Sequence, residues 1–269
     1  MNTGFVGVGS MGGMLVRALL RARRLSPPEV WLANRSPQKA ASLAAEFPGV
    51  HPAKNREVAK RCDLIFLCVG GADIPSVLAE MDSELYPGQL LLTTANVVPL
   101  KALEDRIPCR VAKLIPSITQ EIAVGITLLM YGSRITQEDS RLLENLLGFI
   151  SHVIPIPESQ ARPAISLTSG APALIAYLLQ SMADAAVRDN PEITTQMAQS
   201  MVQQTAAATI RLMEKAKMTP QDVIQRVAVP GGMTALSIDI LSRSVPQAWT
   251  AIFQQIAEKE RQSRSNLVL

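Results

Sequence analysis

The sequence predicts an α/β domain followed by an all-helical domain, and three observations carry this prediction. Short apolar segments alternate with helical periodicity through residues 1–157. The first apolar segment runs directly into a glycine-rich turn and a helix, whereas residues 158–269 contain no convincing strand. Because strands that alternate with helices favour a mostly parallel sheet, we place the domain boundary near Pro157, where the class changes.

The expected strands are short apolar runs, which is typical of strands buried in a parallel sheet. They cover residues 3–8, 30–33, 64–69, 90–94, 111–115, 125–130 and 153–156. Helices are expected between several of them, most clearly over residues 11–24 and 137–149. Another helix is expected to begin at Ser36-Pro37, because serine suits the N-cap and proline suits the first helical position.

The second half is expected to hold four helices. The first covers residues 163–188, and the others begin near Asn190-Pro191, Thr219-Pro220 and Pro246, the last running to about Gln262. Residues 163–183 carry no charge, but their prolines, serines and glycine argue against a membrane span. Several helices are apolar on more than one face, and a domain of about 110 residues has limited interior. We therefore predict an obligate homodimer, or a higher homo-oligomer.

The composition excludes several classes of enzyme. The chain has two histidines and three cysteines, without the spacing of a zinc site, so no metal is expected. It also lacks the GxSxG motif that accompanies many serine hydrolases. Any demanding chemistry is therefore expected to come from a bound organic cofactor. The unpaired cysteine pattern and the absence of a signal peptide favour the cytoplasm, and the net charge of +3 does not favour a nucleic-acid partner.

The glycine-rich turn predicts the kind of cofactor. Residues 7–12 read GVGSMG and follow a strand and open a helix, which is the context required for a Rossmann-type dinucleotide-binding site. In such sites the first glycine permits the tight turn, the second lets the backbone approach a pyrophosphate, and the third allows close helix packing. The predicted cofactor contacts in this turn are Gly7, Gly9, Ser10, Met11 and Gly12.

The end of the second expected strand predicts which nicotinamide is used. Asn34, Arg35 and Ser36 stand where NAD-binding proteins carry an acid for the ribose 2′-hydroxyl. An arginine there can pair with a 2′-phosphate. The sequence therefore favours NADPH over NADH, with Asn34, Arg35 and Ser36 among the cofactor contacts, although Arg35 could also be a solvated loop charge.

A Pro-Gly-Gly turn in the helical half is the expected substrate site. Residues 229–234 read VPGGMT and precede a helix that begins near Met233. Successive backbone N–H groups at such a turn can bind an anion, and Thr234 adds a hydroxyl. An ordinary turn between two helices is the alternative. No lysine lies between Lys113 and Lys215, so hydroxyls, amides and water are the expected substrate-side donors.

Several motifs together resemble the pyrroline-5-carboxylate reductases. They are GFVGVGSMGGML at residues 4–15, Asn34-Arg35-Ser36, SGAPALIAYLLQSMADAAV at residues 169–187, Gln204-Thr205, and the VPGGMT turn. The resemblance implies a Rossmann domain, here residues 1–157, and a helical dimerisation and substrate domain, here residues 158–269. It also implies reduction of the C=N bond of 1-pyrroline-5-carboxylate to L-proline by hydride transfer.

Carried over to this chain, the resemblance implies roles for three residues at the substrate. Gly231, Gly232 and Thr234 would hold the substrate carboxylate, and Thr234 would lie near the imine nitrogen as the catalytic group. It adds Val69, Gly70 and Pro116 to the cofactor contacts. An imine accepts hydride readily, so this chemistry needs neither a metal nor a histidine.

Four positions depart from the pattern of those reductases and leave alternatives open. Gly70, Ser117, Gly170 and Val229 replace residues that are polar or longer in the family. Residues 109–119, CRVAKLIPSIT, resemble a divergent paralogue from late-competence operons. One alternative is therefore an NADP-binding paralogue with a regulatory or accessory role. A second is a reductase that acts on a different small carbonyl or imine.

Overall fold

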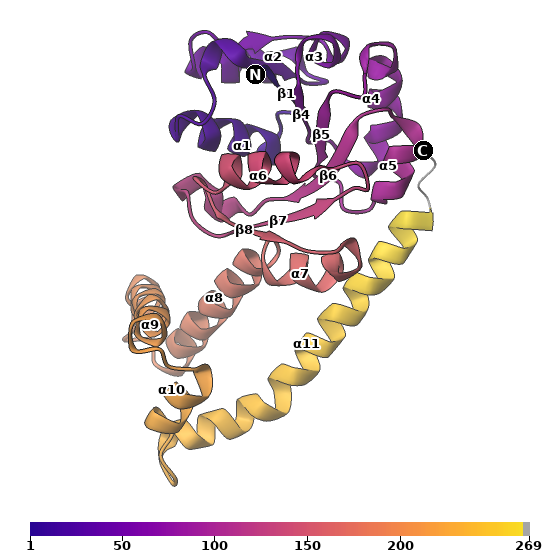
Figure 1. The fold of residues 1–269 in the computed structure, drawn as a ribbon. Coiled ribbons are helices and arrows are strands. Elements are labelled where there is room, and N and C mark those ends of the chain that lie inside the picture. Colours follow the sequence, from indigo (N-terminus) through magenta and orange to yellow (C-terminus); the bar gives the residue numbers. More distant parts are fainter. Residues whose placement is uncertain (266–269) are drawn as a thin grey trace. The chain divides into compact units, whose positions relative to one another are not determined.

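The computed structural model describes residues 1–265, and the chain forms two compact units (Figure 1). Unit 1 contains Met1–Pro172 together with the end of the last helix, from Lys259, and unit 2 contains Ala173–Glu258. The predicted domain boundary at residue 157 stays a prediction, since the sheet ends at Pro155 whereas the first compact unit continues to Pro172.

Unit 1 is built on one eight-stranded sheet with the order β3-β2-β1-β4-β5-β6-β7-β8. All neighbouring strands are parallel except β6 and β7. The strands are β1 (Thr3–Val6), β2 (Val30–Ala33), β3 (His51–Pro52), β4 (Leu64–Leu67), β5 (Leu90–Thr93), β6 (Arg110–Ile115), β7 (Ile126–Tyr131) and β8 (His152–Pro155). The order reverses between β1 and β4, which is where doubly wound sheets bind their ligands. The predicted Rossmann-type α/β domain is confirmed.

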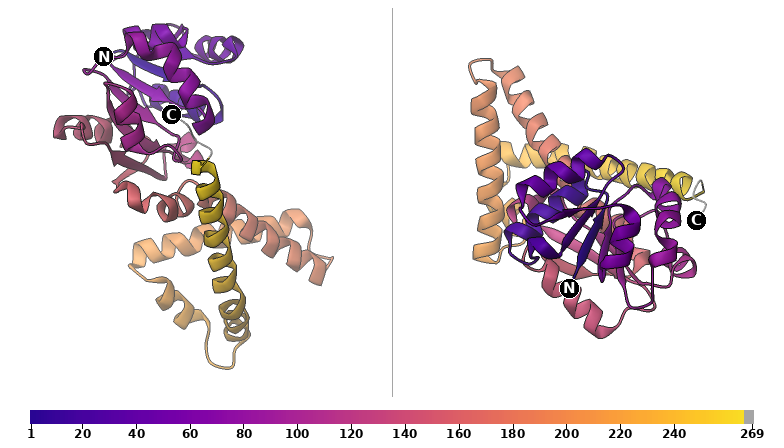
Figure 2. Two further views of the ribbon diagram at one scale, coloured as in Figure 1. Left: turned by 90° about the vertical axis from the view of Figure 1, so that its right-hand side faces the viewer. Right: turned by 90° about the horizontal axis from the view of Figure 1, so that it is seen from above.

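Helices cover both faces of this sheet, as the views in Figure 2 also show. On one face, α1 (Ser10–Arg21), α2 (Pro37–Glu46) and α6 (Gln137–Leu147) share a core with Phe5 and Leu32. On the other, α3 (Asn55–Arg61), α4 (Ile74–Met81), α5 (Leu100–Arg106) and α7 (Ala161–Leu167) pack around Ile65 and Leu91. Two-sided burial explains why the strands read as continuous apolar runs.

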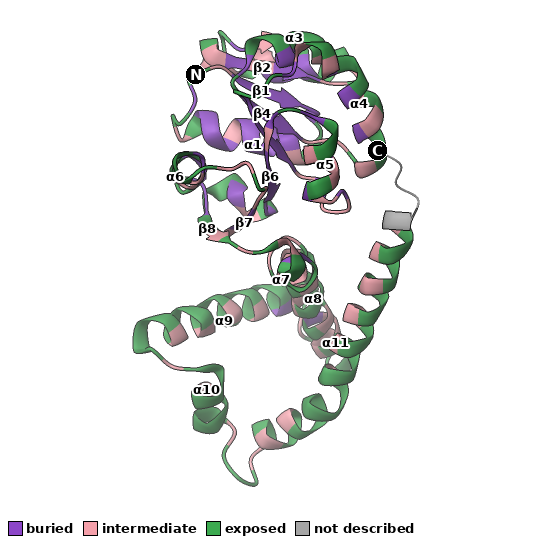
Figure 3. Cartoon of the chain, turned by 45° about the vertical axis from the view of Figure 1, so that its right-hand side comes forward, coloured by how far each residue is buried: buried purple, intermediate pink, exposed green. Residues whose placement is uncertain are grey.

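Unit 2 is all helical, as predicted, and no strand follows Pro155 in the described residues. Its helices are α8 (Ala171–Asp189), α9 (Thr195–Ala216), α10 (Pro220–Val227) and α11 (Met233–Ser265), with α8 and α11 each continuing into unit 1. Few residues of these helices are buried (Figure 3). Their exposed residues include large apolar side chains such as Tyr177, at 69%, and Met182, at 66%. In the single chain, these apolar side chains are not buried in a hydrophobic core.

Three helix boundaries differ from the sequence-based predictions. The helix expected over residues 163–188 is interrupted at Thr168–Gly170 and forms α7 and α8. Helix α9 begins at Thr195 rather than near Asn190, because the Thr194 side chain caps it by accepting from the Met197 N–H. Pro246 lies inside α11 and does not begin a helix. Proline is favoured in the first turn of a helix, but it also occurs inside helices, where it removes one backbone hydrogen bond and can kink the helix. The presence of Pro246 alone therefore did not determine where the helix begins.

One helical stretch, Glu158–Asp189, is long and apolar enough by composition to cross a membrane, which is weak evidence by itself. The interruption at Thr168–Gly170 divides this stretch into shorter helices.

Candidate functional site

The three glycines of the turn after β1 have different surroundings. Gly7 has a φ of +92°, and a Cβ added there would lie 2.4 Å from the Cys68 carbonyl oxygen. A Cβ added at Gly12 would lie 2.0 Å from the Gly7 carbonyl oxygen, whereas one added at Gly9 would meet nothing within 4 Å. Gly7 and Gly12 are therefore required by the fold itself. Gly9 is exposed and leaves the backbone open to a ligand at the N-terminus of α1, where a pyrophosphate would be stabilised.

Asn34 holds this turn in place. Its Oδ1 accepts a hydrogen bond from the Val8 N–H at 3.0 Å, and its Nδ2 donates to the Ser36 carbonyl at 3.1 Å. The Gly7 N–H also donates to the Ala33 carbonyl at 2.8 Å. These bonds join the turn after β1 to the turn after β2, so Asn34 supports the predicted cofactor site through its own side chain.

Arg35 extends from the same turn into solvent. Its side chain is 91% exposed. Among the described residues it forms one ion pair, from Nη1 to Asp73 Oδ1 at 3.7 Å, and no hydrogen bond. The guanidinium therefore keeps its donors available to a ligand at this edge of the sheet.

The opposite side of the glycine turn is formed by the segment after β4. The Cys68 N–H donates to the Val6 carbonyl at 2.7 Å, and burial raises the pKa of the Cys68 thiol to about 12. The thiol is therefore protonated at neutral pH and does not act as a nucleophile. Val69 is partly exposed and Gly70 is exposed, so the predicted cofactor contacts here are accessible.

The segment after β6 is fixed by buried polar groups. Pro116 and Ser117 are buried. Gln120 donates to Thr127 Oγ1, which lies 2.6 Å from Ser151 Oγ. Sequence patterns gave no signal for this network, because its members are up to 31 positions apart and lie on different elements.

The predicted substrate turn lies in unit 2. Gly231 has a φ of +76°, and a Cβ added there would meet nothing within 4 Å. Thr234 is exposed in the first turn of α11, a helix of 33 residues whose N-terminus favours an anion. The Gly232 N–H donates to the Val229 carbonyl at 3.0 Å, so in this conformation it is engaged within the turn.

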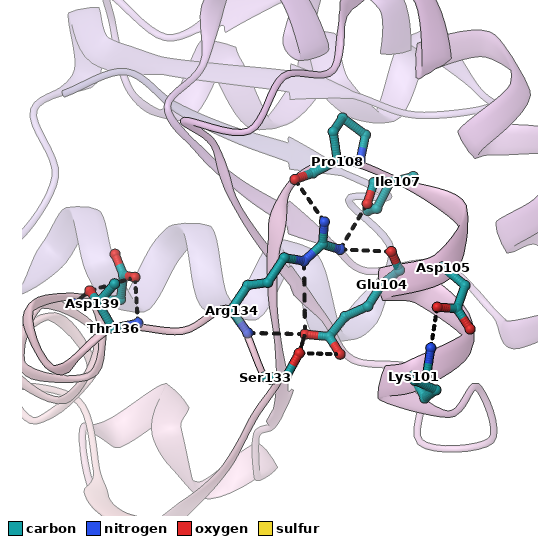
Figure 4. Close-up of polar contacts among 9 residues, drawn as sticks. All are labelled: Lys101, Glu104, Asp105, Ile107, Pro108, Ser133, Arg134, Thr136 and Asp139. Atoms are coloured by element: carbon teal, nitrogen blue, oxygen red, sulfur yellow. Dashed lines mark hydrogen bonds and ion pairs between the residues drawn. The ribbon is translucent and has the colours of Figure 1, made fainter.

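A second polar cluster, centred on Arg134, has a structural role (Figure 4). Arg134 donates to the carbonyls of Pro108, Ile107 and Glu104 at 2.8–3.0 Å. The Glu104 carboxylate in turn accepts from Ser133 and from the Arg134 N–H. Because β7 is antiparallel to β6, Arg134 lies at the edge of the sheet opposite the glycine turn. The cluster satisfies carbonyls at the end of α5.

No group of three or more potential metal ligands occurs in the part of the chain that the structure describes. The cofactor residues all lie in unit 1, and the predicted substrate residues lie in unit 2. Within unit 1 the structure brings together the turns after β1, β2 and β4, whereas the VPGGMT turn belongs to unit 2, at the start of α11.

Comparison with known proteins gives a match for each part of the chain. Residues 2–97 match a family model described as NADP oxidoreductase, coenzyme F420-dependent. Residues 158–263 match the model for pyrroline-5-carboxylate reductase dimerisation.

Curated relatives match along almost the entire chain. Pyrroline-5-carboxylate reductase 3 of Bacillus subtilis is 29% identical over 95% of this chain and 94% of its own length. ComE operon protein 4 of the same bacterium is 28% identical over 94% of this chain and 93% of its own length. Pyrroline-5-carboxylate reductase of Escherichia coli is 26% identical over 88% of both chains.

Solved structures share the fold. Pyrroline carboxylate reductase of Plasmodium falciparum with NADP bound matches with a TM-score of 0.83 and 18% identity, over 98% of this chain and 97% of that one. A pyrroline-5-carboxylate reductase from Coxiella burnetii matches with a TM-score of 0.79 and 23% identity, over 100% and 98% of the two chains.

The glycine turn lies open at the point where the strand order of the Rossmann sheet reverses, and the surrounding domain matches an NADP oxidoreductase model. The protein is therefore an NAD(P)-dependent oxidoreductase. The helical part matches a domain through which such enzymes dimerise. The match to the pyrroline-5-carboxylate reductase dimerisation model, together with relatives of that name along almost the entire chain, confirms the resemblance carried by the motifs.

Proposed function

We propose that this protein reduces 1-pyrroline-5-carboxylate, or a related cyclic imine, with NADPH as the hydride donor. The observation that carries the proposal is the open turn at Gly231, which directly precedes a long helix with the exposed Thr234 in its first turn. Such a turn suits a small carboxylate. The product would be L-proline or the corresponding cyclic amino acid.

Each part of the proposed mechanism uses residues already described. Gly9 and the N-terminus of α1 would hold the pyrophosphate, and Arg35 would pair with the 2′-phosphate. Bound NADPH supplies the hydride. The amides at Gly231 and Thr234 would hold the substrate carboxylate, and the Thr234 hydroxyl would donate a hydrogen bond toward the imine nitrogen. For Gly232 to contribute as well, its N–H would have to leave the Val229 carbonyl.

A second candidate function is an NADP-binding protein with weak or no reductase activity. The likeness to ComE operon protein 4 supports it, as do the departures at Gly70, Ser117, Gly170 and Val229. Packing does not require glycine at residue 170, since an added Cβ would meet its nearest atom, the Ser166 carbonyl oxygen, at 3.5 Å. The loss of a hydroxyl-bearing side chain there therefore has no steric explanation. A reductase for another small carbonyl or imine is the third candidate.

One assay separates these candidates. Purified protein is mixed with NADPH and 1-pyrroline-5-carboxylate, and the absorbance of the reduced nicotinamide is followed. Turnover supports the first proposal. Tight NADPH binding without turnover on this imine would overturn it in favour of the second candidate, and turnover only on other imines or carbonyls would favour the third.

Arg35→Ala is expected to weaken NADPH binding much more than NADH binding. Loss of a charge-assisted contact corresponds to about 10- to 100-fold in the dissociation constant of NADPH, whereas NADH lacks the 2′-phosphate. Titration of nicotinamide fluorescence measures both constants. Arg56→Ala removes an arginine of α3 whose side chain is 67% exposed and paired with Glu84, and it should change neither. Equal losses for the two nucleotides with Arg35→Ala would refute a role at the 2′-phosphate.

The protein is expected to form an obligate homodimer, or a larger homo-oligomer, through unit 2. Sedimentation should show no monomer at micromolar concentration. Tyr177→Glu places a charge on an apolar side chain that is 69% exposed in the single chain, and burial of that charge at an interface should release monomer. Leu142→Glu in α6 changes an exposed apolar residue of unit 1 and should leave the assembly unchanged. A stable wild-type monomer would contradict the proposal.

We propose a cytoplasmic location and neither a nucleic-acid nor a membrane partner, with the imino acid as the small-molecule substrate.

A further inference from the structure

Asp73 occupies a position that no motif indicated. It comes directly before α4, in the segment that follows β4, and its backbone N–H donates to the Gly70 carbonyl at 2.9 Å. Strands β2 and β4 flank β1 in the sheet, so the turn that carries Arg35 and the segment that carries Asp73 flank the glycine turn. The ion pair between Arg35 and Asp73 therefore joins the two segments on either side of the predicted nucleotide site.

The Asp73 carboxylate has no structural role in the described residues. It forms no side-chain cap for α4 and accepts no hydrogen bond. The pair with Arg35 is loose, at 3.7 Å, and both side chains are exposed, at 91% and 52%. An exposed ion pair of this geometry adds little to stability, so stability does not explain why an acid lies against this arginine.

The negative charge of Asp73 affects which nicotinamide cofactor binds beside Arg35. A 2′-phosphate that paired with the Arg35 guanidinium would come within a few ångströms of the Asp73 carboxylate. Two like charges so close repel, even where solvent screens them. NADH carries a neutral 2′-hydroxyl in place of the phosphate, so the same carboxylate does not repel it and can accept its hydrogen bond.

We propose that Asp73 is a second determinant of nicotinamide choice, which weakens binding of the 2′-phosphate that Arg35 attracts and so brings the affinities for NADPH and NADH closer together. The inference rests on the proposed cofactor site, and it deepens that proposal by naming an opposing residue. Dinucleotide-binding proteins selective for NAD carry their acid at the end of the second strand, whereas this chain supplies one from the segment after β4.

The test is the effect of Asp73→Asn on the dissociation constants of NADPH and NADH, measured by nicotinamide fluorescence with the full chain and no substrate. We expect NADPH to bind about three- to tenfold more tightly and NADH to change less than about twofold. The gain for NADPH should shrink as the salt concentration rises. Asp73→Ala should give a similar gain, which separates removal of the charge from a new hydrogen bond made by the asparagine.

Glu80→Gln is the matched control, because it removes the charge of an exposed acid in α4, the helix that follows Asp73, beyond the segment that pairs with Arg35. It should change neither constant. Unchanged or weaker NADPH binding in both Asp73 variants would overturn the inference, since it would mean that Asp73 is neutral or helps to position Arg35. Binding of NADPH without turnover would overturn the proposed reaction while leaving this inference intact. A wild-type protein that binds neither nucleotide would overturn both the cofactor site and this inference.

Discussion

Thr234→Ala is expected to lower kcat/KM for the cyclic imine about 100-fold or more, while leaving the affinity for NADPH unchanged. Reduction of a C=N bond requires the nitrogen to gain or keep a proton as hydride reaches the carbon. A positioned donor in such a step contributes about 10²- to 10⁴-fold. Thr234 is the one hydroxyl in the VPGGMT turn, and the two histidines of the chain lie in unit 1.

The controls for this substitution come from the same helix. Thr234→Ser keeps a hydroxyl and should retain most of the activity. Ser237→Ala removes a hydroxyl that bonds to the Met233 carbonyl within α11, and it should change kcat/KM less than about twofold. If Thr234→Ala proved as active as wild type, Thr234 would not be the donor. The backbone amides and bound water would then have to orient and protonate the imine.

Lys113→Ala is expected to lower the free energy of unfolding by about 3 kcal/mol. Lys113 lies on β6 with its side chain 0% exposed, and it pairs with Glu158, whose side chain is 31% exposed. The Lys113 ammonium also donates to the Asn96 carbonyl at 2.9 Å, and the same Glu158 oxygen accepts from the Leu100 N–H at 3.1 Å. Removal of the lysine takes this donor from the Asn96 carbonyl and removes the positive charge beside Glu158, although water that reaches Glu158 moderates the loss.

Urea unfolding at matched protein concentration measures this effect, because oligomers gain apparent stability with concentration. Lys113→Met keeps most of the buried stem and should lose less stability than Lys113→Ala. Lys101→Ala breaks an exposed pair with Asp105, with side chains 78% and 60% exposed, and should cost about 0.3–0.5 kcal/mol. If Lys113→Ala and Lys101→Ala lowered the free energy of unfolding by similar amounts, the buried ion pair of Lys113 would contribute no more to stability than an exposed pair.

Local patterns sufficed wherever the physical requirement was local. The positive φ of Gly7 and the close contact of Gly12 with Gly7 are requirements within one turn, so the glycine spacing predicted them. The start of α10 at Pro220 was also predictable, because Thr219 and Asp222 form a capping box within four residues. Strand β2 was predicted with its observed bounds, since Val30–Ala33 is a short apolar run between polar turns.

Predictions were less accurate where distant residues decide the structure. The two-residue strand β3 was not predicted as a strand, because its pairing with β2 gives it its regularity and its sequence does not. The Asp73–Arg35 pair joins positions that no periodicity connects. The hydrogen bond from the Gly232 N–H to the Val229 carbonyl depends on the backbone conformation of the turn. The sequence does not determine that conformation, because glycine adopts both positive and negative φ.

The sequence by itself determined the class of the protein: a dinucleotide-binding α/β region followed by an all-helical region whose helices carry apolar residues on more than one face. Only the tertiary structure decided which segments belong together. Residues 158–172 pack with the sheet, because Glu158 meets the buried Lys113 and Ala161 enters the core beside β4 and β5. Periodicity records only which side of a helix is apolar, whereas a buried charge must find its partner across the chain, here 45 positions away.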